Sequence, residues 1–435
     1  MKIKKTSALL LLLFILYGLS GKTQIITTVV GNGTFCTFNG DSIPATSTYL
    51  DQVHQVTVDS FGNIYYSDYG CMGFNVAASR IRQVNQSTGL VFTLAGGGSS
   101  WANNIHGDSV DICCANGVAF DKFGNVYYSV AVDYVVRKIS LATGIVTTVV
   151  GTGLQGNSGD SALAINATLG QPWGLATDTA GNLYIADPLG NCVRKVNTST
   201  GIITTVAHGN AWYLALDSIG NIYFSDYQKI KKMTISTGII STIAGTNSAG
   251  YNGDNILAIN AWLNYPSEVA FDHFGNLYIA DRNNSRIRKV DKNTGLITTV
   301  AGTGTAGYNG DNIPATSAEI DEPITIAIDM SGDLYIGGYT GSRIRKVIMS
   351  TNIYETNQSM DVSLYPNPTT SVLNISSEEK IKEIKIINVL GEIIYQSVID
   401  KLKTTIDLSK IARGIYLICL TGNDYKKSTK KIIIQ

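Results

Sequence analysis

Histidine, the side chain most used for metal binding and for proton transfer near neutral pH, is scarce in this sequence. The 435 residues contain four, at His54, His106, His208 and His273. None lies in a His-x-His or His-Glu-x-x-His spacing, so no zinc motif is present. The Gly-x-Ser-x-Gly elbow of serine hydrolases is also missing. We therefore predict no catalytic residues and no metal site.

An excess of charge of one sign is lacking as well. Lys and Arg together number 33, as do Asp and Glu. The balance differs between parts, because positions 6–361 carry 19 basic and 26 acidic residues, a net of −7, whereas the chain from Val362 onward has 11 and 7, a net of +4. A mildly acidic main body argues against nucleic acid as a partner, since phosphates require a basic face.

Long apolar runs are absent after the first twenty residues. There, three lysines precede the apolar run from Ala8 to Leu19, and small residues follow at 18–20, which predicts a signal peptide over residues 1–20. About twelve apolar residues are too few to span a bilayer. We expect no transmembrane segment once the signal is removed; an N-terminal anchor is the alternative.

Cysteine is sparse, with six residues in the chain. Export would permit disulfides. A bridge among Cys36, Cys71 and the pair Cys113 and Cys114 is one expectation, and the sequence does not choose the pairing.

The chain is rich in a repeated unit of about forty residues. In the copy at 266–304, turns rich in Gly, Asn and Asp separate four short β-type segments, and segment 286–290 alternates charged and apolar residues as a half-buried strand does. The first turn of six copies holds a glycine: Gly62, Gly124, Gly181, Gly220, Gly275 and Gly332. Three residues before each stands an aspartate: Asp59, Asp121, Asp178, Asp217, Asp272 and Asp329.

The sixth copy lacks its fourth segment, and the matching residues stand near the N-terminus. Residues 24–31 read QIITTVVG, close to TGLITTVAG at 294–302. A ring explains the permutation, because the N-terminal strand would complete the last sheet beside Arg343–Val347 and leave no free edge. We predict an all-β, six-bladed β-propeller over residues 21–356, closed by the N-terminal strand.

The copies resemble the NHL-repeat family of propellers. The resemblance rests on GNLYIAD followed by NSRIRKV (275–290) and on GDNIPATSAEI in the connector at 310–320. Two copies depart from the pattern, with Val130 and Gly338 where the others have a strand-ending aspartate: Asp68, Asp187, Asp226 and Asp281. We expect the aspartates of the first turn to cap it, and the strand-ending ones to pair with the basic third strand or to accept from the connector backbone. Calcium bound by loop Asp and Asn is an alternative, without EF-hand spacing; no other cofactor is predicted.

The last eighty residues, 357–435, have a different character. They resemble the type A C-terminal sorting domain of the type IX secretion system of Bacteroidetes-type bacteria. The residues that carry the resemblance are Pro366, Asn367, Pro368, Gly391, Gly414, Tyr416, Lys430 and Lys431. It implies a small Ig-like β-sandwich recognised by the secretion machinery, often cleaved, on a protein that is secreted or held at the outer cell surface. An ordinary Ig-like binding module is the alternative.

The residues expected at the entrance to the central axis of the ring differ from copy to copy. They are therefore the best candidates for a binding site. Five residues before each first-turn aspartate stand His54, Asn116, Trp173, Trp212, Ser267 and Ile324. The next positions include Tyr213 and Glu268. The connector between the third and fourth copies, at 208–211, is short, so this part of the face formed by the connectors (the connector face) should lie lower than the rest. Aromatic residues beside a concavity can stack on a sugar or a peptide. The predicted ligand-binding residues are Trp173, Trp212, Tyr213, His208, Tyr227, His54 and Glu268.

Three functions are compatible with this pattern. The first is a secreted or surface propeller that binds an extracellular glycan, protein or peptide and catalyses nothing. The second is a lyase- or lactonase-type enzyme with an axial site, in which His54 and Glu268 bind a metal or transfer protons. The third is an adhesin or surface scaffold. The aromatic residues could also plug the axis or pack under the connectors, in which case no pocket would exist.

Overall fold

The computed structural model describes residues 24–35, 38–70, 79–349, 362–388, 393–422 and 427–435. The predicted signal peptide at 1–20, Cys36, Cys71 and Gly391 lie outside these residues. The chain divides into two compact units, residues 1–350 and 351–435, which are described separately. Within the described residues, no helix is long and apolar enough to cross a membrane.

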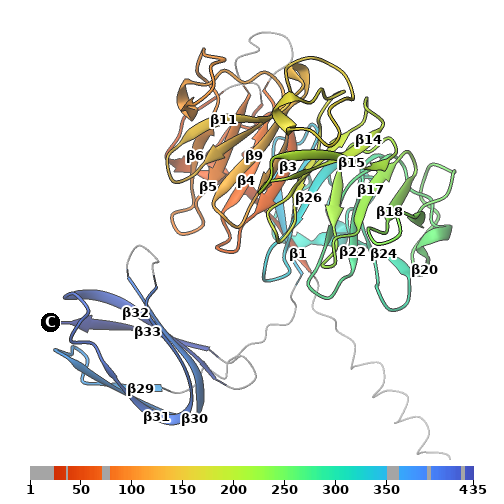
Figure 1. Cartoon of the computed structure of the whole chain (residues 1–435). Coiled ribbons are helices and arrows are strands. Elements are labelled where there is room, and N and C mark those ends of the chain that lie inside the picture. Colours follow the sequence, from red (N-terminus) through yellow and green to blue (C-terminus); the bar gives the residue numbers. More distant parts are fainter. Residues whose placement is uncertain (1–23, 36–37, 71–78, 350–361, 389–392, 423–426) are drawn as a thin grey trace, which may run out of the picture. The chain divides into compact units, whose positions relative to one another are not determined.

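The first unit is all-β and contains six antiparallel sheets (Figure 1). The first sheet consists of β2 (Ile43–Pro44), β6 (Leu90–Ala95), β5 (Arg80–Val84), β4 (Ile64–Asp68) and β3 (Val53–Val58). The second consists of β7 (Ile105–His106), β11 (Ile145–Val150), β10 (Val135–Ser140), β9 (Asn125–Val130) and β8 (Ala115–Phe120). The third consists of β12 (Leu175–Thr177), β13 (Leu183–Asp187), β14 (Cys192–Asn197) and β15 (Ile202–His208).

The other three sheets repeat this order of strands. The fourth consists of β16 (Leu214–Leu216), β17 (Ile222–Asp226), β18 (Lys229–Met233) and β19 (Ile240–Ala244). The fifth consists of β20 (Ile256–Leu257), β24 (Leu296–Ala301), β23 (Arg286–Val290), β22 (Leu277–Asp281) and β21 (Pro266–Phe271). The sixth consists of β25 (Ile313–Pro314), β1 (Ile25–Val30), β28 (Ile344–Ile348), β27 (Leu334–Gly338) and β26 (Pro323–Ile328).

Short 3-10 helices lie in the connectors and loops. They are η1 (Ala45–Ser47), η3 (Gly107–Ser109), η4 (Ala131–Asp133), η5 (Ala164–Asn166), η6 (Ala258–Asn260), η7 (Arg282–Asn284) and η8 (Ala315–Ser317).

The N-terminal strand β1 lies in the sixth sheet. It pairs antiparallel with β28, with Ile26 opposite Val347 and Thr27 opposite Lys346. The predicted pairing of residues 25–30 with residues 343–347 is thus confirmed. Gly31 follows β1 with a φ of +86°, and a Cβ there would lie 2.3 Å from the carbonyl oxygen of Ser342, so the close approach of the two segments requires glycine.

The first strands of the sheets are neighbours in a cyclic order, from β3 through β8, β12, β16, β21 and β26 back to β3. Between consecutive sheets lie separate clusters of buried apolar side chains. One cluster joins the sixth sheet to the first, because Val30, Tyr335 and Ile344 pack in it with Val53 and Val56. Burial of apolar surface between sheets therefore stabilises the whole circuit, including the junction of the two ends.

The aspartate of each first turn caps that turn, as predicted. Asp59 Oδ1 accepts hydrogen bonds from the backbone N–H groups of Phe61 and Asn63, both at 2.9 Å. Its Oδ2 accepts from the hydroxyl of Tyr65 at 3.0 Å. The same turn bonds recur at the other five copies. The backbone donors of the turn are thereby satisfied.

The strand-ending aspartates also behave as predicted. Asp281 Oδ1 accepts from the backbone N–H of Asn264 at 2.8 Å, and its Oδ2 lies 3.6 Å from Nη1 of the fully buried Arg288. The connector aspartate Asp254 contacts the other end of that guanidinium at 2.9 Å. A third-strand arginine can therefore lie between two carboxylates.

The second unit contains a single five-stranded antiparallel sheet within its described residues. Its strands are β29 (Val362–Tyr365), β30 (Val372–Ile387), β31 (Ile393–Asp407), β32 (Gly414–Gly422) and β33 (Lys427–Ile434). Asn367 joins the start of the unit to its last strand, since its Nδ2 donates to the carbonyl of Lys431 at 2.8 Å and its Oδ1 accepts from Ile433 N at 3.0 Å. The hydroxyl of Tyr416 donates to the carbonyl of Ala412.

Candidate functional site

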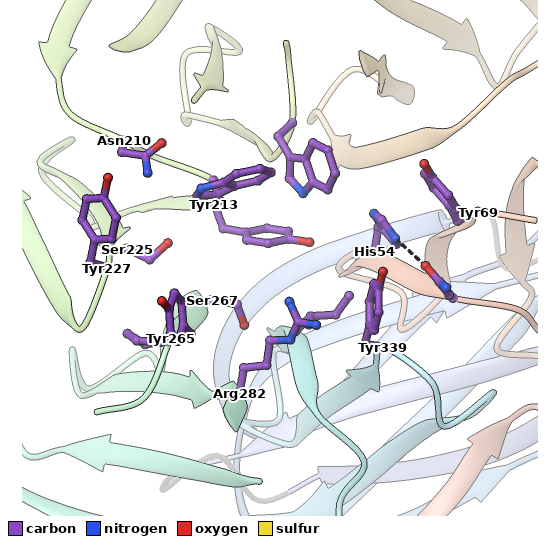
Figure 2. A pocket seen from close by; sticks show the side chains of 15 residues that line it. His54, Tyr69, Asn210, Tyr213, Ser225, Tyr227, Tyr265, Ser267, Arg282 and Tyr339 are labelled. Atoms are coloured by element: carbon purple, nitrogen blue, oxygen red, sulfur yellow. Dashed lines mark hydrogen bonds between the residues drawn. The ribbon is translucent and has the colours of Figure 1, made fainter. Parts of the chain in front are cut away.

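The connector face of the first unit holds a cavity of about 500 Å3. Its lining is dominated by rings (Figure 2). The ring-bearing residues are His54, Tyr69, Trp173, Trp212, Tyr213, Tyr227, Tyr265 and Tyr339. They come from every repeat but the second, so the cavity lies where the loops of different sheets converge.

Five of the seven predicted ligand-binding residues line this cavity, namely His54, Trp173, Trp212, Tyr213 and Tyr227. The other two do not. His208, at the end of β15, is exposed elsewhere. Glu268 is buried and lines a second cavity, of about 390 Å3, between the first strands of the sheets.

The short connector between β15 and β16 brings two tryptophans together. The rings of Trp173 and Trp212 meet edge to face, with centroids 4.8 Å apart. Trp212 remains 38% exposed, whereas Tyr213 beside it is 5% exposed. Trp212 can therefore offer a free ring face to a ligand, while Tyr213 mainly forms the wall behind it.

His54 is held neutral in this cavity. Its ring stacks on Tyr69 with centroids 4.2 Å apart and 4° between the planes, and Nε2 lies 3.2 Å from Oε1 of Gln52. Burial, followed by the positive charge of Arg282, lowers the pKa of His54 to about 3. Its Nδ1 is buried and has no hydrogen-bond partner among the residues the structure describes. One hydrogen-bonding position of the neutral imidazole is therefore left unsatisfied by the described protein groups.

Glu268 belongs to a hydrogen-bond network below the cavity. It accepts from the Nε2 of Gln55, the hydroxyl of Thr325 and the backbone N–H of Ile326. Burial raises the pKa of this carboxyl to about 8, although these hydrogen bonds lower it. The network ties first strands together at the centre of the circuit and separates Glu268 from the lining that contains His54.

Four lining residues share a position in the repeat that sequence reasoning did not use as a whole. Tyr69, Tyr227, Arg282 and Tyr339 each directly follow the last residue of a second strand. Only Tyr227 was predicted. The six copies have Tyr69, Ala131, Pro188, Tyr227, Arg282 and Tyr339 at this position, so a comparison of the copies could have drawn attention to it. Among the described residues, no group of three or more His, Cys, Asp or Glu side chains is placed to hold a metal ion.

The cysteine prediction remains untested, because Cys36 and Cys71 lie outside the described residues. The sulfurs of Cys113 and Cys114 lie 3.2 Å apart, and neither forms a disulfide within the described part of the chain.

Residues 363–435 match the family described as the secretion system C-terminal sorting domain. The second unit is therefore a type IX secretion sorting domain. A protein with this domain is exported by the type IX machinery and is either secreted or present at the cell surface.

Solved structures show that the fold of the first unit is shared. A structural genomics protein of unknown function from Bacteroides thetaiotaomicron has a TM-score of 0.57 at 19% identity, covering 74% of this chain and 75% of its own. An auxiliary nutrient binding protein from Bacteroides thetaiotaomicron has a TM-score of 0.56 at 16% identity, covering 74% of this chain and 76% of its own. One from Bacteroides ovatus has a TM-score of 0.55 at 18% identity, covering 75% of this chain and 76% of its own. At these identities the similarity shows a propeller-like fold and nothing more.

Curated relatives match in short parts only. The chain is 32% identical over 96 residues to Protein SUPPRESSOR OF QUENCHING 1, chloroplastic, of Arabidopsis thaliana, which is 22% of this chain and 9% of that protein. It is 30% identical over 132 residues to human Teneurin-4, 26% of this chain and 5% of that protein. The chain thus spans a small fraction of either relative.

Proposed function

We propose that this type IX-exported chain is a non-catalytic binding protein of the cell surface, which takes an extracellular glycan or peptide in the aromatic cavity. In this proposal the six sheets are the blades of a closed NHL-type propeller at residues 21–356. Residues 1–20 are a signal peptide, and residues 357–435 are a sorting domain whose single described sheet folds over on itself into an Ig-like sandwich.

The observation that carries this proposal is the lining of the cavity. Trp212, Tyr227 and Tyr265 line the cavity and are exposed by 38, 62 and 54%. Flat apolar rings with polar atoms at their edges are well suited to the ring faces of sugars or to peptide side chains. A scaffold without a small-ligand site would not need such a cavity.

The same lining favours binding over catalysis. No Asp or Glu stands among the lining residues within the described ranges, and the imidazole of His54 is a weak base at a pKa of about 3. General acid–base catalysis works best with a pKa near the operating pH. The pair of His54 and Glu268 considered from the sequence is divided between two cavities.

The proposal is tested by removing exposed rings and measuring binding on a glycan and peptide array. Trp212→Ala together with Tyr227→Ala should weaken binding of any ligand found by about tenfold or more, since each 1.4 kcal/mol changes affinity tenfold. Trp262→Ala is the matched control, because Trp262 is also exposed, at 42%, and does not line the cavity. Equal binding by the double variant and the control would reject this site. Tyr213→Ala is unsuitable, since truncating a buried ring destabilises the fold.

A further inference from the structure

Among the described residues that line the cavity, one side chain, that of Arg282, is charged, and two neighbours hold it in place. Nε and Nη2 of Arg282 donate to Oε2 of Glu322 at 3.1 and 2.8 Å. The guanidinium also lies 4.5 Å from the centroid of the Tyr339 ring. Nη1 has no hydrogen-bond partner among the residues that the structure describes, and the side chain extends towards the middle of the cavity (Figure 2).

The charge of Arg282 acts on groups across the cavity. After burial, it is the second cause of the lowered pKa of His54. Burial raises the pKa of Tyr213, and among the smaller influences Arg282 lowers it. Both effects have the sign of a positive potential, which favours a negative charge and disfavours a second positive charge.

Glu322 pairs with one edge of the guanidinium from outside the lining, and no acidic side chain among the described residues lines the cavity itself. The side chain of Glu322 is 38% exposed. His54 adds no positive charge, because it is neutral at physiological pH. The polar groups that remain are hydroxyls, amides and the imidazole, placed between flat rings. This arrangement suits a ring rich in hydroxyl groups that carries one negative charge.

We propose that the ligand of the cavity is a carboxylate-bearing saccharide, with a uronic or sialic acid residue whose carboxylate accepts a hydrogen bond from Nη1 of Arg282. The sugar ring faces pack on the exposed aromatic rings around Trp212. This inference depends on the proposed binding function and specifies its ligand class.

The test compares acidic saccharides with neutral counterparts by calorimetry on the purified protein. The probes are trigalacturonate and its methyl ester, and 3′-sialyllactose and lactose, so that the two sources of a sugar carboxylate are separated. At least one acidic probe should bind about tenfold more tightly than its neutral partner, as expected for one charge-assisted hydrogen bond in a half-exposed site.

Two variants change the net charge at the cavity in opposite directions. Arg282→Gln should abolish the advantage of the acidic probe over its neutral partner. Glu322→Gln removes the counter-charge of the guanidinium and keeps a hydrogen-bond acceptor beside it, so it should preserve or increase that advantage. Arg343→Gln is the control, since Arg343 lies over Tyr308 at 3.9 Å in the same way but outside the cavity. Thermal unfolding shows whether each variant is folded, and Glu322→Gln supplies the test if Arg282→Gln is not.

The outcomes separate this inference from the function on which it depends. Equal or tighter binding of the neutral probes, or binding of peptides alone on the array, overturns the carboxylate and leaves a binding protein. An acidic preference that survives in Arg282→Gln also overturns it. If no glycan or peptide binds, the proposed function itself fails.

Discussion

Gln55 and Glu268 stand 213 positions apart in the sequence, yet Nε2 of Gln55 donates a hydrogen bond to Oε1 of Glu268 at 2.5 Å. The carboxamide oxygen of Gln55 accepts from the backbone N–H groups of Val118 and Leu175, both at 3.0 Å. One amide therefore joins β3, β8, β12 and β21 below the aromatic cavity. The cost of this arrangement is a carboxyl group buried away from water.

This carboxyl makes the stability of the protein depend on pH. The pKa of Glu268 is raised from 4.5 to about 8, so between these values the folded state keeps a proton that the unfolded state has lost. The free energy of unfolding contributed by Glu268 is therefore fully present below pH 4.5 and falls as the pH rises towards 8. His54, with its lowered pKa, has the opposite sign in the acidic range. A variant is needed to isolate Glu268.

Glu268→Gln removes the titration and retains the shape. The variant should be less stable than the wild type at pH 5, because its amide places a donor against the N–H of Ile326 or the amide of Gln55. The difference should shrink or reverse by pH 9, by up to about 1.4 kcal/mol per pH unit. Urea unfolding at several pH values measures it. Parallel stability curves for the two proteins would contradict the assigned pKa.

Much of the fold of the first unit could be predicted from the sequence, because its main features recur in several copies of the repeat. The turn aspartates and the basic third strands recur in a fixed order, and the fourth strand that the last copy lacks pointed to the matching residues at the N-terminus. Asp59 caps its turn with neighbours two and four residues away, so no distant contact was required to predict it.

The site was harder to predict, because its residues meet only through the closed circuit. Tyr339 and Arg282 lie in different repeats, and their stacking depends on how consecutive sheets pack. Adjacent residues also have opposite roles, since Ser267 faces the aromatic cavity and Glu268 the second one. Sequence position at the axis entrance therefore identified the region, and it did not separate a lining residue from one in the network below.

Closure by the N-terminal strand gives a second prediction. Ile26 is fully buried in a cluster with residues of the fifth and sixth sheets, while Thr27 beside it is half-buried. Ile26→Ala should lower the free energy of unfolding by about 2–5 kcal/mol, the usual cost of truncating a buried isoleucine. Thr27→Ala is the control and should change it by about 0.5 kcal/mol or less. Chemical unfolding checks both values. Equal small effects would mean that the strand does not contribute to the core.

The sixth copy of the repeat lacks the aspartate that ends the second strand, and this difference yields a third prediction. Gly338 ends β27 where the fifth sheet has Asp281, so the buried Arg345 contacts one carboxylate, Asp311 at 3.2 Å, among the described residues. Arg288 contacts two, Asp254 at 2.9 Å and Asp281 at 3.6 Å. Asp311 also accepts from both the N–H and the hydroxyl of Thr28 in β1.

Removing the connector carboxylate should therefore cost more in the sixth sheet than in the fifth. Asp311→Ala leaves a buried guanidinium without a counter-charge and should lower the free energy of unfolding by about 2–4 kcal/mol, whereas Asp254→Ala should cost about 1–2 kcal/mol, because Asp281 remains. The two aspartates are matched in exposure, at 26 and 29% of their side chains. Asp108→Ala, at an exposed pair with His106, should have no measurable effect. Urea unfolding measures both costs. If Asp254→Ala lowers the free energy of unfolding as much as Asp311→Ala does, the carboxylate of Asp281 does not compensate the charge of Arg288, and this prediction is wrong.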